Sequence, residues 1–357
     1  MRDIAIIAYA QSDCVADVGA VNEVELIMPL VQKVLADSGL KSVQNVDFTC
    51  SGSCDYQQGA AFAFVLGVDA LGAVPPIKES HVEMDAAWAL YEGWLKIQAG
   101  QAETALIYGF GKSSPGDLPI VLSKQLDPYY SAPLAPDSVS MAAMQARLML
   151  EAGDITEEDM AQVVSHSRAM AKNNPHAQLK GDFSVEQLLA EPTYLSPLRK
   201  HDCCPVSDGA SAIVMCTVEK AKELGKPYAL IKGIDHRIES GHIGLRNLRE
   251  SSSTKIAAAK AGVAKGKVEV AEIYTPFSHQ EHLVKLALGL DDDCDINPSG
   301  GVLAGNLMMA SGLSRIGEVA MRICNGEYKR GVAHITSGAC LQQNMVVVLE
   351  GAELWLN

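Results

Sequence analysis

The sequence predicts an α/β protein in which helices cover a largely parallel sheet. Short apolar runs rich in β-branched residues alternate along the chain with stretches of helical periodicity, which is the pattern of strand–helix–strand units. With 357 residues, 48% of them hydrophobic, the chain can bury a large core as one big domain or as two fused halves. A helix–glycine–strand unit also occurs twice, which suggests a duplicated architecture.

The N-terminal elements follow from periodicity. We expect a strand at 4–8, a helix at 24–38, a strand at 45–50, an alanine-rich helix at 58–71, a helix at 85–98 and a strand at 104–108. The first helix is indicated by Leu26, Leu30, Val31 and Val34, which share one face.

A different composition marks residues 116–200. Prolines become frequent, and the runs QLDPYYSAPLAPDS and KNNPHAQLKGDFS predict an excursion that packs over the core, with a long helix at 154–173 inside it. A buried central strand is then expected at 208–215, followed by a short helix at 219–224. Pro227 opens a second series, which begins with a strand at 229–234.

The second series repeats the first. A helix at 312–325 ends at Gly326 and leads to a strand at 332–336, as the helix at 85–98 leads through Gly100 to its own strand. This repetition predicts two strand–helix halves in which one helix N-terminus from each half faces a shared centre.

Charge and composition exclude several functions. The net charge of −14 argues against nonspecific binding to nucleic acid or to an anionic membrane, and no Walker or dinucleotide-type glycine loop occurs. No apolar run approaches the roughly twenty residues that span a bilayer, and the start MRDIAIIAYAQ indicates a buried strand more than a signal peptide. The nine scattered cysteines favour reduced thiols in a cytoplasm over a disulfide framework.

Several motifs, in order along essentially the whole chain, resemble those of the thiolase superfamily, specifically its sterol-carrier or lipid-transfer-protein branch. They are the helix–Gly–strand unit ending in GFGKSS, NNPHA at 173–177, CCPVSDGASAIVM at 203–215, EIYTPF at 272–277 and NPSGGVLAGNLMMASG at 297–312. The resemblance implies an α/β thiolase fold, with duplicated mixed five-stranded sheet halves, helices in αβαβα layers and an inserted loop region. It places an N-terminal half at 1–115, completed by 203–225, a loop region at 116–202 and a C-terminal half at 226–357.

The sequence departs from the family where a thiolase carries its catalytic groups. Glu83 stands at the position of the nucleophilic cysteine, just before the helix at 85–98, and Asn306 replaces the histidine of the Gly-His-Pro motif. The C-terminal cysteine–glycine loop corresponds to Thr336–Leu341. Thiolysis requires a thiolate activated by a base and a second acid/base group. Ordinary thiolase turnover is therefore not expected.

Four residues are candidate catalytic groups: Glu83, Tyr274, Asn306 and Cys340. Glu83 could act as a base held by the helix N-terminus or simply cap the helix, for which Asp85 is the better structural candidate. Tyr274 lies where steroid side-chain aldolases that resemble this chain carry a tyrosine; it could relay a proton or be a core tyrosine. Asn306 could donate to a thioester carbonyl or occupy a turn. Cys340 could be a nucleophile or acid, or inert core.

The histidines are weaker candidates. His279 and His282 in HQEH share a helix face, but without a third ligand they predict a solvent-facing helix start and no metal site. His334 lies inside an expected strand and is interpreted as structural.

Other cysteines also carry weak signals. The pairs Cys203–Cys204 and Cys50–Cys54 lack convincing zinc spacing. The run at 50–53, CSGS, mimics the thiolase Cys-Ala-Ser-Gly turn, but it ends a strand too early along the chain and is interpreted as a decoy.

The favoured hypothesis is an enzyme of lipid or steroid degradation that acts on an acyl-CoA thioester and cleaves a carbon–carbon bond by a retro-aldol-type step. In this hypothesis Tyr274 and Glu83 move protons, while Asn306 and helix-terminal N–H groups hold the developing enolate. The alternatives are a catalytically silent subunit of a heteromeric thiolase-like complex and an acyltransferase that recruits Cys340 or Cys50.

The resemblance also implies binding partners. The CoA thioester is a substrate, not a covalently bound cofactor. Thiolase-fold relatives pair through their N-terminal halves, so we expect a homodimer or a heteromer. A small protein with a zinc ribbon and an OB-fold is a candidate partner that could supply acyl-CoA binding.

Overall fold

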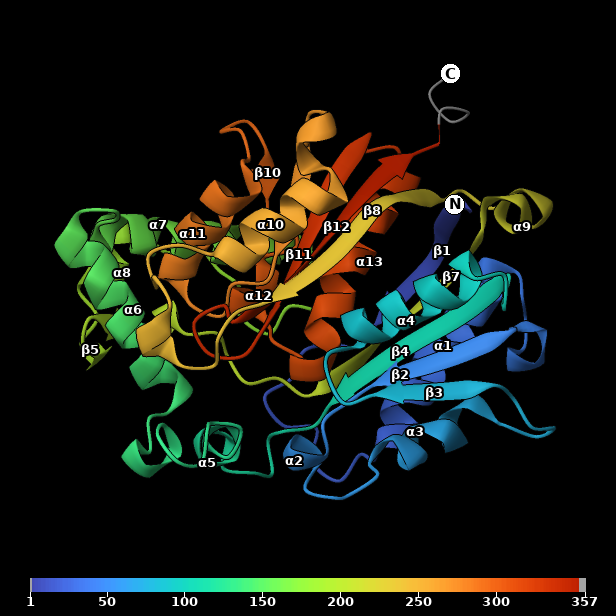
Figure 1. Ribbon diagram of the computed structural model, residues 1–357, viewed down its shortest axis with the longest axis horizontal. Helices are drawn as coiled ribbons and strands as arrows, with labels where there is room; N and C mark the ends of the chain where they lie inside the picture. Colours follow the sequence, from blue (N-terminus) through green and yellow to red (C-terminus); the bar gives the residue numbers. More distant parts are fainter. Residues whose placement is uncertain (1, 353–357) are drawn as a thin grey trace.

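The computed structural model describes residues 2–352, and its centre is a ten-stranded sheet (Figure 1). The strand order is β10-β9-β11-β12-β8-β1-β7-β4-β2-β3. The strands are β1 (Ile4–Gln11), β2 (Phe48–Gly52), β3 (Glu79–Val82), β4 (Thr104–Gly111), β7 (Gly209–Thr217), β8 (Ala229–Ile238), β9 (Val270–Ile273), β10 (Asp295–Ile296), β11 (Arg330–Ser337) and β12 (Gln343–Gly351).

The sheet is a repeat of one five-stranded pattern. β3-β2-β4 pair in parallel, and β4-β7-β1 pair in antiparallel fashion. The other half repeats this order, because β10-β9-β11 are parallel and β11-β12-β8 are antiparallel. The duplication predicted from the sequence is confirmed, whereas the expectation of a largely parallel sheet is wrong: the parallel pairs lie only at the two outer ends. Antiparallel pairing of β1 with β8 joins the halves through Ala5↔Leu230 and Ile6↔Ala229.

Helices form three layers around the two halves of the sheet. The outer layer of the N-terminal half contains α1 (Glu23–Ser38) and α3 (Phe64–Leu71), which pack on each other. The outer layer of the C-terminal half contains α10 (Ser252–Ala261) and α11 (Ser278–Leu288). Between the halves lie α4 (Ala86–Gln98) and α13 (Ser311–Cys324). α4 packs on strands of the N-terminal half, α13 packs on strands of both halves, and the two helices contact each other. The order of layers is therefore αβαβα.

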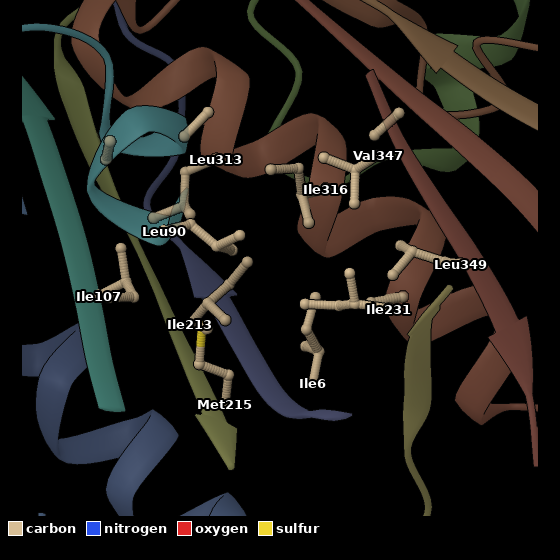
Figure 2. Packing of buried hydrophobic residues seen from close by; sticks show 14 of the residues in the cluster. Ile6, Leu90, Ile107, Ile213, Met215, Ile231, Leu313, Ile316, Val347 and Leu349 are labelled. Carbon is tan, nitrogen blue, oxygen red and sulfur yellow. The ribbon is translucent and has the colours of Figure 1, made fainter. Parts of the chain in front are cut away.

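The largest part of the core surrounds the two central helices. In Figure 2, Leu90 of α4 and Leu313 and Ile316 of α13 fill the space between the two halves of the sheet. They belong to one cluster with side chains from strands of both halves, which are Ile6, Ile107, Ile213, Met215, Ile231, Val347 and Leu349. Burying a side chain of this size stabilises the fold by about 1.5–3 kcal/mol. This packing fixes where the two helices begin.

A helical excursion between β4 and β7 covers one end of the C-terminal half (Figure 1). It contains α5 (Leu118–Ser123), α6 (Ser138–Ala152), α7 (Glu157–Met170), α8 (Val185–Leu189) and the hairpin of β5 (Thr193–Leu195) and β6 (Leu198–Arg199). The helix expected at 154–173 corresponds to α7 and a short 3-10 turn, Ala171–Asn173. α6 is an element that the sequence reading missed. Within residues 2–352, none of the helices combines the length and hydrophobicity that a membrane span requires.

The helix expected at 58–71 is wrong as a single element. The structure has a one-turn helix α2 (Asp55–Gln58), a break, and then α3. The Asp55 carboxylate accepts hydrogen bonds from the Phe62 and Ala63 N–H groups at 2.8 and 2.9 Å, and Phe62 has a φ of 57°. This local turn replaces the helical hydrogen bonds that the alanine-rich composition favours.

Candidate active site

The two central helices begin at a single carboxylate, that of Asp85. As the N-cap of α4, its Oδ1 accepts from the Ala87 N–H at 2.8 Å. The same side chain accepts from the Gly312 N–H at 2.7 Å and the Leu313 N–H at 3.2 Å, in the first turn of α13. The prediction that one helix N-terminus from each half faces a shared centre is therefore confirmed. The capping role given to Asp85 is also confirmed, and it extends to both helices.

Asp85 is 2% exposed. Burial raises its pKa to about 7, although the three N–H groups and Arg315 act in the opposite direction. Its oxygens already occupy the N–H groups that a helix end would offer to an oxyanion. The expectation that these helix-terminal groups are free to hold an enolate is therefore wrong, because Asp85 fills them.

Tyr274 and Asn306 lie in direct contact near this carboxylate. Tyr274 follows β9 directly, and its backbone N–H donates to the His334 carbonyl at 3.0 Å. Its hydroxyl donates to Asn306 Oδ1 at 2.7 Å. Burial, with a further contribution from the charge of Asp85, raises the pKa of Tyr274 well above its usual value. The phenol is thus a protonated group that can give a hydrogen bond at neutral pH.

Asn306 is held by several groups, but within residues 2–352 its own amide protons have no strong acceptor. Its Oδ1 also accepts from the Ser311 hydroxyl at 2.9 Å, and its backbone N–H donates to Ser207 Oγ at 2.9 Å. Its Nδ2 points to two sulfur atoms, Cys204 Sγ at 3.2 Å and Met308 Sδ at 3.4 Å. Sulfur is a weak acceptor. This N–H is therefore suited to donate to an incoming carbonyl or oxyanion oxygen.

A buried ion pair fixes the elements around Tyr274. Glu272, two residues before it on β9, pairs with Arg315 of α13, and both side chains are almost fully buried. Glu272 also accepts from the Ser299 N–H at 2.8 Å and its hydroxyl at 2.7 Å. Loss of one partner of such a pair typically costs about 3–5 kcal/mol. The pair therefore ties β9, the NPSGG turn and α13 into one rigid support.

Glu83 lies at the surface, apart from the Tyr274–Asn306 pair. Its side chain is 47% exposed. Its Oε1 accepts from the Asp55 N–H at 2.6 Å, at the start of α2, and its Oε2 lies 3.3 Å from His81 Nε2. Within residues 2–352, none of its hydrogen bonds reaches Tyr274 or Asn306.

Cys340 belongs to a different cluster. It packs with Met141 and Leu248, and its thiol lies 3.4 Å from the Met141 carbonyl oxygen. Burial raises the pKa of Cys340 to about 11 and that of Cys50, which is fully buried on β2, to about 12. Neither environment favours a thiolate.

Cys204 is a site residue that the sequence reading did not single out. The Cys203–Cys204 pair lacks zinc spacing, yet Cys204 contacts Asn306 directly. Burial raises its pKa to about 11. The available signal was its place in CCPVSDGA, immediately before the motif that forms β7.

The histidines serve the fold. The expected solvent-facing start of α11 is wrong, since His279 is 1% exposed and its Nε2 lies 3.2 Å from Gln145 Oε1. Burial lowers the pKa of His279 to about 3, which keeps it neutral. His334 is fully buried beside Asn344, in agreement with its structural interpretation. Within residues 2–352, no group of three or more His, Cys, Asp or Glu side chains could hold a metal ion.

Two cavities open in the helical excursion. One, of about 620 Å³, is lined by α6, the β5–β6 hairpin and residues 243–248. The other, of about 540 Å³, lies between α7, α8 and residues 200–206 and is called here the α7–α8 cavity. Cys204 lines it, and the Sγ atom of Cys204 lies 3.2 Å from Asn306 Nδ2.

The chain is similar in sequence to several characterised proteins. It is 30% identical to benzoylsuccinyl-CoA thiolase subunit BbsB of Thauera aromatica over 57% of this chain and 60% of that protein. It is 27% identical to acetyl-CoA acetyltransferase of Methanocaldococcus jannaschii over 89% of both chains. It is 24% identical to human sterol carrier protein 2, over 84% of this chain and 62% of that protein. The matches thus span less than two thirds of two of these relatives. No family model matches the chain.

Solved structures share the fold. Human mitochondrial 3-ketoacyl-CoA thiolase in complex with CoA superposes with a TM-score of 0.78 at 17% identity, over 98% of both chains. An Ltp2-ChsH2(DUF35) aldolase superposes with a TM-score of 0.81 at 18% identity, also over 98% of both chains. The fold predicted from the sequence motifs, an α/β thiolase fold, is confirmed.

Proposed function

We propose that this chain, a member of the thiolase superfamily, binds an acyl-CoA thioester and cleaves a carbon–carbon bond in it by a retro-aldol-type step. The observation that carries the proposal is the Tyr274–Asn306 pair. It joins a protonated phenol to an amide whose N–H groups face only sulfur. The thioester class is supported by the sequence similarity to acyl-CoA enzymes and by the CoA complex of a thiolase with the same fold.

In the proposed reaction the substrate is a β-hydroxyacyl-CoA. In one concerted step the bond between the α and β carbons breaks, Tyr274 receives the proton of the β-hydroxyl and gives its own phenolic proton to the α carbon, so the phenol ends in its starting state. The products are an aldehyde or ketone and the shortened acyl-CoA. Asn306 Nδ2 donates to the thioester oxygen, where enolate-like negative charge develops during the step. No cysteine nucleophile is needed.

We propose a supporting role for Glu83. Because it is hydrogen-bonded at the start of α2 and half exposed, it orders the turn next to Cys54 rather than moving a proton. Cys340 takes no part in the step, since its thiol packs against α6. A Glu83→Gln variant in the assay below tests the first assignment, which predicts an unchanged pH profile.

The proposal is tested with a Tyr274→Phe variant. Purified protein is incubated with a panel of β-hydroxyacyl-CoA thioesters, and carbonyl products are trapped with a hydrazine while the released acyl-CoA is followed by mass spectrometry. The variant is expected to lose activity about 10²–10⁴-fold, the usual contribution of a proton-transferring side chain. Tyr108→Phe is the matched control, because that buried hydroxyl has no hydrogen-bond partner within residues 2–352. Equal activity of the two variants contradicts the assignment.

A second function has its own supporting observation. The Asp85 side chain accepts hydrogen bonds from the N–H groups at the starts of both central helices. This is expected in a subunit that binds no oxyanion there. Such a subunit would be catalytically silent and would support an active partner. In that case the assembled complex keeps full activity with Tyr274→Phe, so the same variant separates the two functions.

We propose that the chain assembles with a second subunit through the free edge of the sheet. β3 is an outermost strand. Beside it in the N-terminal half, Phe62, Val65 and Leu66 are 71%, 52% and 42% exposed. An edge strand next to exposed apolar side chains is a ready template for pairing. The subunit can be a second copy of this chain or, as the Ltp2-ChsH2(DUF35) complex suggests, a different protein.

A further inference from the structure

The α7–α8 cavity contains a buried cation, Arg168, that forms no ion pair with another side chain within residues 2–352. Arg168 is 6% exposed and lines the cavity. Its guanidinium makes one hydrogen bond, to the Leu303 carbonyl, and no ion pair within residues 2–352. Burial lowers the pKa of Arg168 to about 10, which reflects the cost of keeping this charge away from water, while the charge of Glu191 acts in the opposite direction. A guanidinium carries five N–H donors, so most donors of Arg168 have no acceptor among residues 2–352.

The other charges in the cavity leave a positive excess. Lys200 and His201 line it together with Glu191. The Glu191 carboxylate lies 2.9 Å from His201 Nδ1 and offsets part of the positive charge, and Lys200 stacks over the ring of Tyr194 at 4.7 Å. Because Arg168 and Lys200 face this one carboxylate, the cavity keeps a positive excess that can attract an anion, in a chain whose net charge is −14. Unpaired buried cations are rare in proteins because they are costly.

We propose that the α7–α8 cavity binds a carboxylate carried on the acyl part of the thioester substrate, with Arg168 as its main ligand. The cavity has the volume of a small-molecule site, about 540 Å³. Cys204 is among its lining residues, and its Sγ lies 3.2 Å from Asn306 Nδ2. A thioester held at Asn306 can thus extend its acyl group past Cys204 toward Arg168, which recognises carboxylates in a two-point geometry. The inference rests on the proposed acyl-CoA substrate and narrows it to acidic acyl groups.

The test compares two thioesters that differ at the acyl end. Succinyl-CoA carries a carboxylate where butyryl-CoA carries a methyl group, and the CoA parts are identical. Dissociation constants of both are measured by isothermal titration calorimetry with the full chain. We expect wild type to bind succinyl-CoA about 10–100-fold more tightly, the usual value of a hydrogen bond to a charged group. Arg168→Gln should abolish this preference without changing butyryl-CoA binding, and Arg168→Lys should restore part of it.

Two further variants and a measurement with inorganic phosphate separate the possible outcomes of this test. Lys200→Gln, which leaves the Leu303 contact intact, should reduce the preference even if Arg168 variants fold poorly. Lys172→Gln removes a nearby exposed cation paired with Asp182 and should change nothing. Butyryl-CoA binding without any preference overturns this inference and leaves the proposed function standing, whereas failure to bind either thioester overturns the proposed function. Inorganic phosphate that binds wild type but not Arg168→Gln, with no preference between the thioesters, identifies a phosphate site instead.

Discussion

Replacing Asp85 by asparagine tests the central arrangement of the site. The Asp85 side chain accepts three N–H groups with two oxygens, Oδ1 from Ala87 and Leu313 and Oδ2 from Gly312. In Asp85→Asn one oxygen becomes an NH₂ group, so at least one helix N–H loses its acceptor. A buried donor without a partner costs about 1–3 kcal/mol.

This cost depends on pH because burial raises the Asp85 pKa from 3.8 to about 7 in the folded protein. Below about pH 4 the side chain is protonated in both the folded and the unfolded states. Between these values the unfolded state releases its proton while the folded state retains it, so the contribution of Asp85 to stability falls as pH rises. A shift of about three units corresponds to about 4 kcal/mol, fully lost above about pH 7. Asparagine does not titrate.

The free energy of unfolding of wild type and Asp85→Asn is measured by guanidinium denaturation, followed by far-UV circular dichroism, from about pH 4 to about pH 8. The variant should be less stable by about 1–3 kcal/mol at the acid end, and the difference should vanish or reverse at the alkaline end. Asp137→Asn is the matched control, since Asp137 caps α6 alone through the Ser140 N–H at 2.6 Å, and Asn is an equally good N-cap. A difference that stays constant or grows with pH refutes the reasoning.

The remaining predictions concern close packing and assembly. In Gly312→Ala the new Cβ would lie 2.5 Å from both Asp85 Oδ1 and Ile335 Cγ2, which should lower the free energy of unfolding by about 1–3 kcal/mol. Gly244→Ala, whose Cβ meets nothing within 4 Å, should be close to neutral, and equal effects in denaturation would contradict the packing argument. Sedimentation velocity should show self-association of the purified chain that Phe62→Glu weakens. A wild type that stays monomeric until a different protein is added points to the heteromer.

Much of the architecture could be predicted because it depends on local patterns. The apolar face of α1 and the buried runs of β1, β4, β7 and β11 are visible as periodicity, and the structure has them within a few residues of the expected ranges. The break between α2 and α3 was not visible, because it depends on one side chain, Asp55, which bonds to backbone groups seven and eight residues away. The buried start of α11 depends on contact with α6, which no local pattern encodes.

The residues of the candidate site are likewise only partly predictable from the sequence. The motifs predict both Tyr274 and Asn306 as site residues, but their 2.7 Å hydrogen bond joins positions 32 residues apart. It depends on contacts distant in sequence, such as that of the Asn306 N–H with Ser207. Glu83 was nominated for its place in the sequence, and the structure directs its side chain to α2 at the surface instead. Cys204 and Arg168 were not nominated, since only the packing of the helical excursion brings them to one cavity.

The sequence by itself determined the duplicated α/β fold and the residue types available for chemistry. These depend on periodicity and on the identity of single residues. Tertiary structure alone decided which of those residues meet. It placed one buried carboxylate, Asp85, at the start of α4 and against the N–H of Gly312, 227 residues further along the chain, and it put a phenol beside an amide whose N–H groups contact sulfur atoms. The physical reason is that both arrangements follow from α4 and α13 packing between the two halves of the sheet, and burial there sets the charge of Asp85 and Tyr274.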